Sequence, residues 1–327
     1  MIVANYWAEA RRQHGLGRQK ITVQRWGWSD TSEAEAQAMA EVRADEALAQ
    51  AQRDAATPRR ERKTAYNGAQ GLPIREEVLQ RQGDAVITRN GYGAECLNTP
   101  NVLFADVDFE PCTSTQMRLA AAALLVVAVQ LPALWLLGGM LAWVVGVGAL
   151  LLLTLPLAAL MQRGVDAALG GPHVRALAGL RAFIERHPAW AVRVYRTPAG
   201  LRLLATQGLV DPVGAEAQEF FAAVGADPVY VRMCLNQRCF RARLTGKPWR
   251  MGIHQHMRPR PGVWPVRPEQ LRLREEWVRH YEERAAQYAA CHWIESLGSG
   301  AMHLDVRPVV ELHDRLSGAL EPQRPLA

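Results

Sequence analysis

The chain has 327 residues, a length that is long for one domain and suits two. Hydrophobic residues make up 49% of the sequence, as in a globular protein and unlike a disordered one. The formal net charge of +6 does not distinguish a nucleic-acid ligand from an anionic membrane surface. The five cysteines form no paired framework, which excludes a small disulfide-stapled protein and agrees with a reducing compartment.

The first 95 residues predict an N-terminal α/β region. Residues 20–28, KITVQRWGW, alternate as a strand does, and the Ala- and Glu-rich stretch after them predicts a helix capped at Asp30 or Ser32. Asn67-Gly68 and Asn90-Gly91 are turn signals. The N-terminus has no apolar core of the kind that signal peptides carry, so we expect it in the cytoplasm.

Residues 101–110, NVLFADVDFE, predict a strand that carries two aspartates two positions apart. Side chains at i and i+2 share one face of a strand, so Asp106 and Asp108 point the same way. They could hold a metal ion, pair with basic residues, or face water. A carboxylate in a buried sheet is costly unless something pairs with it.

The stretch 119–161 contains no charged residue and predicts a helical hairpin in a lipid bilayer. About 20 apolar residues cross the hydrocarbon core, so this run is long enough for two spans, divided at Gly138-Gly139. Arg118 and Arg163 flank the run, which favours a cytoplasmic location for both ends. A re-entrant hairpin and a hairpin buried in a soluble core are the alternatives.

The segments after the hairpin alternate between helix and strand patterns. Helices are predicted over 172–187 and 211–225, and strands over 189–197, 200–206, 228–235 and 238–244. With the strand at 101–109, and leaving the hairpin aside, the order is β-α-β-β-α-β plus one strand. We therefore predict an α+β fold built on a ferredoxin-like sheet with both helices on one face.

The other face of that sheet is expected to be open. Alternation places Asp106 and Asp108 there together with Arg193, Arg202 and Arg232. Ion pairs between neighbouring strands, above all to Arg202, are the structural alternative to metal binding.

Two segments of this core, ADVDF and ADPVYVRMCLNQRCFRARLTGKPW, resemble the archaeo-eukaryotic primases and primase-polymerases, whereas the segment between them, YRTPAGLRLL, departs from the family's pattern. The resemblance implies an RRM-like or ferredoxin-like core with Asp106, Asp108 and Asp227 as catalytic carboxylates, the first two holding Mg²⁺ or Mn²⁺. It also implies phosphate or anion contacts from five cations: Arg202, Arg232, Arg238, Arg241 and Lys247. Arg202 stands where that family has a histidine, which favours a degenerate core. As a whole the chain is similar to bacterial membrane proteins, which implies the inner membrane with the soluble parts in the cytoplasm.

Residues 228–268 contain nine lysines and arginines, four interleaved aromatic residues and no acidic residue. Such a segment suits a nucleic-acid backbone with stacked bases, and it suits an anionic membrane surface equally well. A long helix is predicted over 268–298.

We therefore expect three parts: residues 1–95, a ferredoxin-like core over 96–245 interrupted by the hairpin 119–161, and a basic loop with C-terminal helices over 246–327. The main hypothesis is a membrane-anchored protein whose degenerate primase-like core binds a lipid headgroup, a nucleotide or a nucleic acid. One alternative is an active Mg²⁺- or Mn²⁺-dependent nucleotidyltransferase, and another is a structural membrane scaffold. They differ in whether Asp106 and Asp108 lie in a cleft or are paired.

Overall fold

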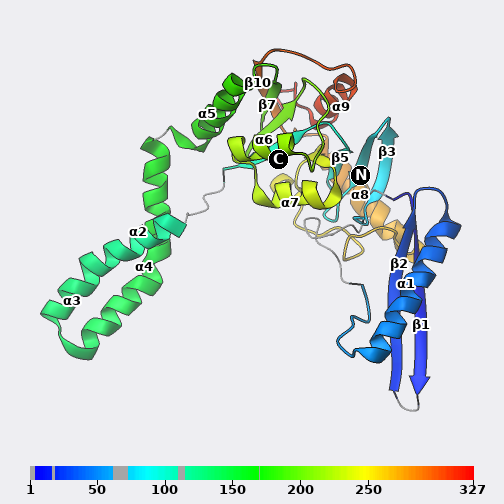
Figure 1. Cartoon of the computed structure of the whole chain (residues 1–327), viewed down its shortest axis with the longest axis horizontal. Helices are drawn as coiled ribbons and strands as arrows, with labels where there is room; N and C mark the ends of the chain where they lie inside the picture. The colour runs from blue at the N-terminus through cyan, green and yellow to red at the C-terminus, as the bar shows by residue number, and fades with distance from the viewer. Residues whose placement is uncertain (1–3, 17–18, 62–72, 110–114, 169) are drawn as a thin grey trace.

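The structure is a computed structural model that describes residues 4–16, 19–61, 73–109, 115–168 and 170–327 (Figure 1). Within these ranges the chain is a mixed α+β protein with three small antiparallel sheets and a hairpin of long apolar helices. The predicted turn at Asn67-Gly68 lies outside the described residues.

In chain order, the strands are β1 (Tyr6–Leu16), β2 (Gln19–Ser29), β3 (Glu77–Gln82), β4 (Ala85–Arg89), β5 (Glu95–Thr99), β6 (Phe104–Asp108), β7 (Ala191–Arg196), β8 (Gly200–Ala205), β9 (Phe240–Arg243) and β10 (His292–Gly298). The α-helices are α1 (Glu33–Arg53), α2 (Thr115–Leu125), α3 (Leu131–Leu136), α4 (Gly139–Ala168), α5 (Gly171–Arg186), α6 (Ala215–Val224), α7 (Pro228–Gln237), α8 (Leu271–Ala285) and α9 (Arg307–Ser317). A π-helical turn, Val126–Gln130, joins α2 to α3.

The N-terminal strands and helix form a unit that projects from the rest of the chain (blue in Figure 1). β1 pairs only with β2, and α1 lies on one face of this ribbon through a row of buried alanines that includes Ala36 and Ala40. Ser32 caps α1 by accepting a hydrogen bond from the Glu35 amide at 3.2 Å, which confirms one of the two predicted caps. The predicted strand over 20–28 and the helix after it are confirmed, whereas β1 was not predicted.

Replacing Gly27 with alanine is expected to destabilise this unit. A Cβ at Gly27 would collide with backbone atoms of Ala36 and Ala40, and backbone cannot move aside as a flexible side chain can. Overpacking of this kind costs about 1–3 kcal/mol. Chemical unfolding followed by tryptophan fluorescence reports it directly, because Trp26 and Trp28 flank the substituted residue. Gly148→Ala is the matched control, since a Cβ at Gly148 meets nothing within 4 Å.

The second sheet has the strand order β3-β4-β5-β9 and joins distant parts of the sequence. β5 pairs with β9 in the register Leu97↔Ala242, so residues before the hairpin share a sheet with residues after α7. The predicted strand over 238–244 is therefore confirmed as β9, but it pairs outside the sheet in which it was expected.

The third sheet has the order β10-β7-β8-β6, and helices α5 and α6 pack against its core side. β6, β8 and β7 follow the neighbour order expected from the sequence, with Asp106 opposite Arg202. Phe183 of α5 and Phe220 of α6 meet edge-to-face at 5.2 Å, in the same buried cluster as Val194. The predicted β6, α5, β7, β8 and α6 are all confirmed.

The fourth strand predicted over 228–235 is wrong, because these residues form helix α7. Asp227 caps this helix and Pro228 occupies its first turn, both of which are helix-start signals. Helical spacing separates the buried residues of α7, which are Tyr230, Met233, Cys234 and Gln237. The alternation in Val229-Tyr230-Val231 had suggested a strand. Arg232 therefore does not lie on the sheet.

The edge position beside β7 is taken by β10, a strand whose residues fall within the helix predicted over 268–298. That helix is confirmed only as α8, which ends at Ala285. The face expected to be open is also covered, because α9 packs on it. Phe104 and Tyr195 lie 5.3 and 4.8 Å from the His313 ring, measured between ring centroids. The polar side chains of this face are satisfied by α9, because Arg193 and the Tyr195 hydroxyl donate to Asp314.

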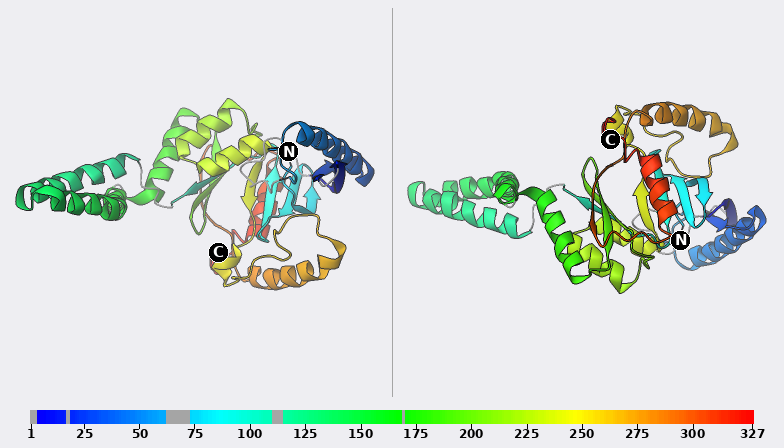
Figure 2. Two further views of the ribbon diagram at one scale, coloured as in Figure 1. Left: turned by 90° about the horizontal axis from the view of Figure 1, so that it is seen from below. Right: turned by 90° about the horizontal axis from the view of Figure 1, so that it is seen from above.

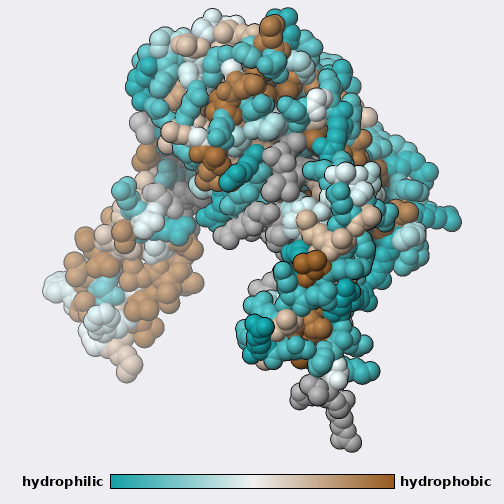
Figure 3. Space-filling model, turned by 45° about the vertical axis from the view of Figure 1, so that its right-hand side comes forward, coloured by the Kyte–Doolittle hydropathy of each residue, from teal (hydrophilic) through white to brown (hydrophobic). Residues whose placement is uncertain are grey.

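The hairpin projects from the core as an arm of helices (Figure 2). Two helices, Thr115–Leu136 and Gly139–Val165, are long and apolar enough to cross a membrane, and they turn at Gly138-Gly139 with φ of +60° and +54°. Only 22% and 11% of their most apolar windows are buried, which does not fit a hairpin inside a soluble core. Figure 3 shows hydrophobic side chains gathered over this arm.

Candidate functional site

A cavity of about 750 Å³ lies where the N-terminal unit, the second sheet and the third sheet come together. The three predicted catalytic carboxylates, Asp106, Asp108 and Asp227, all line it. Its described cationic lining residues are Arg43, Arg75, Arg202, Arg241, Arg243, Lys247 and Arg250. Its described aromatic lining residues are Trp7, Trp26, Trp28, Tyr92, Tyr230 and Trp249.

Asp106 is paired with Arg202 across the β6–β8 ladder. Arg202 Nε and Nη2 lie 2.9 and 3.4 Å from the two Asp106 carboxylate oxygens, and Arg202 Nη1 donates to the Arg243 carbonyl at 2.7 Å. Burial alone would lower the pKa of Arg202, but the Asp106 carboxylate raises it above its usual value. The predicted ion pair is therefore confirmed.

Asp227 and Asp108 have different surroundings. Asp227 accepts hydrogen bonds from the Val229 and Tyr230 amides at 3.0 and 3.3 Å, so its carboxylate is engaged in capping α7. Its own amide donates to the Asp106 carbonyl at 2.9 Å, which fixes α7 against β6. Asp108 is exposed at the end of β6. Among the described residues, no three His, Cys, Asp or Glu side chains form a group that could hold a metal ion. The Mg²⁺ or Mn²⁺ site stays a prediction.

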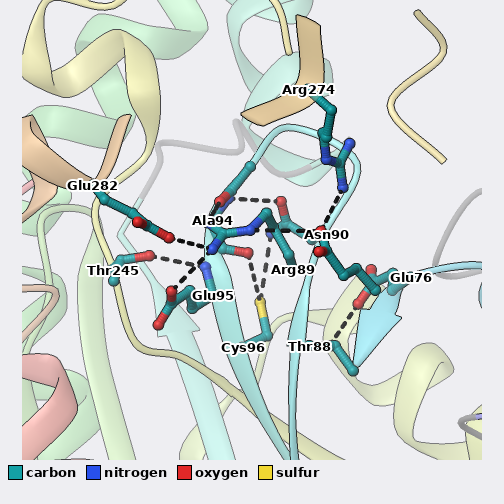
Figure 4. Close-up of polar contacts among 12 residues, drawn as sticks. Glu76, Thr88, Arg89, Asn90, Ala94, Glu95, Cys96, Thr245, Arg274 and Glu282 are labelled. Atoms are coloured by element: carbon teal, nitrogen blue, oxygen red, sulfur yellow. Dashed lines mark hydrogen bonds and ion pairs between the residues drawn. The ribbon is translucent and has the colours of Figure 1, made fainter. Parts of the chain in front are cut away.

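Arg241 is the second predicted anion-binding cation that already has a carboxylate partner. It lies 2.6 Å from Glu76, which is 6% exposed and also accepts from the Thr88 hydroxyl at 2.7 Å (Figure 4). Figure 4 shows a similar arrangement next to it, where buried Arg89 reaches Glu282 at 2.5 Å. Glu76 and Arg241 both line the cavity, so their ion pair neutralises part of its wall.

Two other predicted anion contacts lie elsewhere. Arg232 is exposed on α7 and Arg238 is exposed at its C-cap, and neither is among the cavity-lining residues. Lys247 does line the cavity, with its ammonium 5.5 Å from the Trp249 ring.

Arg75 is a cavity residue that sequence reasoning missed. Its guanidinium stacks over Trp26 at 4.2 Å. Within the described ranges its side chain makes neither a hydrogen bond nor an ion pair. Burial lowers the pKa of Arg75, since nothing compensates fully for the lost water. The only sequence signal was its place in the loop before β3, a common location for binding residues.

Trp7 adds a second unsatisfied group to the same cavity. Its indole Nε1 is buried without a partner among the residues that the structure describes. An indole N–H can only donate, and this one is shut off from solvent, so it is an unsatisfied group behind the cavity wall and not a contact offered to a ligand.

A buried polar cluster lies behind the cavity, on the far side of Arg202. Asp314 accepts from Arg193 at 2.6 Å and from the Tyr195 hydroxyl at 2.8 Å, and it lies 3.0 Å from His313 Nδ1. Burial alone would raise the pKa of Cys291, but His313, whose Nε2 is 3.8 Å from its sulfur, lowers it below its ordinary value. Cys291 is fully buried, so this Cys-His-Asp arrangement supports the sheet and has no access to a substrate.

Comparisons with known proteins bear on neither the fold nor the cavity. No family model, curated protein or solved structure matches this chain. The chemistry of the cavity must therefore be argued from its own residues. They divide into a wall of paired charges around Asp106 and Glu76 and a wall where the Arg75 guanidinium stacks on Trp26.

Proposed function

We propose that this chain is a membrane-tethered protein whose central cavity binds a nucleotide through a degenerate primase-like core. The hairpin supplies the tether, since two apolar helices of sufficient length project from the core with most of their surface exposed. The flanking arginines, Arg118 and Arg163, favour the cytoplasmic side of a bacterial inner membrane for the cavity.

The observation that carries the proposal is Arg75. The Arg75 guanidinium is partly buried, no described carboxylate lies within ion-pair distance of it, and the more distant Glu61 and Glu9 offset its lost hydration only in part. A phosphate oxygen would supply that charge, and arginine presents a planar donor fork that fits phosphate well. Lys247 and Arg250 line the same cavity and extend its cationic character.

The aromatic lining supports a ligand that carries a base as well as a phosphate. Trp26, Trp28 and Trp249 offer ring faces, and base–aromatic stacking is worth about 1–3 kcal/mol per base. A volume of about 750 Å³ lies in the range of small-molecule and cofactor sites. A bare phosphate ion would leave most of this space unused.

The second candidate is an active metal-dependent nucleotidyltransferase. One observation favours it, namely that Asp106, Asp108 and Asp227 converge on this cavity. Binding without catalysis is the better supported function, because Arg202 already neutralises Asp106 and α7 already engages Asp227. Carboxylates that hold two metal ions need free oxygens facing the substrate phosphate.

Quenching of tryptophan fluorescence by nucleoside triphosphate, in detergent-solubilised full-length chain, tests the proposal. Arg75→Gln is expected to weaken binding about tenfold or more, because a hydrogen bond to a charged group is worth about 1.5–3 kcal/mol. Arg232→Gln is the matched control, since Arg232 is exposed and lies outside the cavity, and its affinity should equal that of the native chain. If the native chain binds no nucleotide, the proposal is wrong, and a structural membrane scaffold becomes the better supported function. Equal affinity in Arg75→Gln would remove its main support.

A further inference from the structure

A second cavity, of about 650 Å³, lies at the base of the helical hairpin. Its lining includes Phe109 after β6, Gly171 and His173 at the start of α5, and Arg196 at the end of β7. Phe109 and Gly171 lie close to where the chain leaves the core for the hairpin and returns from it. Arg250 lines this cavity as well as the central one.

The charge of this second cavity differs from that of the central one. Its described lining contains Arg196, Arg250 and His173 and no carboxylate. Arg196 is exposed, and no described residue pairs with its guanidinium. His173 makes an edge-to-face contact with Phe109 at 6.1 Å between ring centroids. The described lining of this cavity is therefore cationic, and Arg196 has no carboxylate beside it of the kind that Asp106 gives Arg202 and Glu76 gives Arg241.

The depth of the cavity follows from the hairpin. The more C-terminal of the two apolar helices ends at Val165, and the lining residue Gly171 begins the next helix. With the hairpin in a bilayer, residues this close to the end of a span lie at the level of the headgroups. Basic side chains at that level attract anionic lipids by about 1 kcal/mol each.

We infer that this cavity binds the phosphate of an anionic phospholipid headgroup through Arg196, with His173 and Arg250 beside it. The inference rests on the membrane tether of the proposed function, and not on nucleotide binding. The lining also offers Phe109, Pro198 and Leu326, apolar groups that suit the glycerol and upper acyl carbons of a lipid better than a free phosphate ion. The cavity would thus couple the cytoplasmic core to the membrane surface at one defined point.

The test uses the full-length chain in detergent, titrated separately with phosphatidylglycerol, phosphatidylcholine and inorganic phosphate, with bound lipid counted by native mass spectrometry. We expect phosphatidylglycerol to bind at least about tenfold more tightly than phosphatidylcholine, and Arg196→Gln to abolish most of that preference. Arg232→Gln should keep the preference, as an exposed arginine away from the hairpin. Arg196 is exposed, so its replacement should leave the thermal midpoint unchanged.

Either of two results overturns the inference. One is an unchanged preference for phosphatidylglycerol in Arg196→Gln, and the other is inorganic phosphate that competes with the lipid at equal concentration. Extraction of membranes with alkaline carbonate tests the tether on its own. If carbonate releases the chain from the membrane, both the tether and this site are overturned. A chain that stays in the membrane while Arg196→Gln has no effect overturns only this site.

Discussion

Replacing Arg202 with methionine is expected to lower the free energy of unfolding by about 3–5 kcal/mol. Arg202 is 1% exposed, it pairs with Asp106 at 2.9 Å, and it donates to the Arg243 carbonyl. Methionine fills part of the space but leaves the Asp106 carboxylate and that carbonyl without their donor. The cost of an unpaired buried group, rather than the strength of the ion pair itself, sets the size of the effect.

A double-mutant cycle with Asp106→Asn separates the pair from the packing of its side chains. The Asp106 side chain is 30% exposed, so water can partly replace Arg202, and Asp106→Asn alone should cost less than Arg202→Met. The double variant should be more stable than the sum of the single losses predicts. If unfolding in denaturant shows a loss of under about 1 kcal/mol for Arg202→Met, the central ion pair does not exist as described.

Asp314→Asn should cost about 3 kcal/mol at pH 7 and flatten the loss of stability in acid. Burial alone would raise the pKa of Asp314, but the hydrogen bond with His313, the Tyr195 hydroxyl and Arg193 bring it below its ordinary value. A carboxylate whose folded pKa is lowered stabilises the protein above its unfolded pKa of about 3.9, and this stabilisation is lost as the pH falls through the folded value.

The measurement is the free energy of unfolding at pH 7 and at steps down to about pH 3. Glu321→Gln is the control, because its pair with Arg324 is 36% and 38% exposed. Exposed pairs contribute about 0–1 kcal/mol. An acid slope that is identical in the native chain and in Asp314→Asn would show that Asp314 is not held by the His313 cluster.

Local signals predicted much of the core. The charge-free run gave the hairpin, and alternation gave β6, β7 and β8 with the correct inward and outward faces. The Asp106–Arg202 pair followed from the strand faces, because neighbouring strands place opposite residues within reach of each other. The convergence of Asp106, Asp108 and Asp227 on one cavity was expected from the resemblance to primases.

The missed features depend on contacts between segments far apart in the sequence. Tyr195 and Asp314 are 119 residues apart, and Arg202 and His313 are 111 apart, so no local pattern could show that α9 covers the sheet. The strand β10 was missed for the same reason. Its residues form a strand because they pair with β7, which is far away in the sequence. Arg75 could not be singled out because its importance comes from the missing partner, which only a structure reveals.

In the proposed function, Arg75 binds the nucleotide phosphate while Asp106 stays paired with Arg202. Calorimetric titration of nucleoside triphosphate into the solubilised chain, with EDTA or with Mn²⁺, tests it most directly. We expect nucleoside triphosphate to bind in EDTA, Mn²⁺ to strengthen the affinity by less than about tenfold, and Asp108→Asn to keep the binding. Binding that requires Mn²⁺ and vanishes in Asp106→Asn and Asp108→Asn would contradict it, and would make these aspartates the ligands of a metal-dependent enzyme.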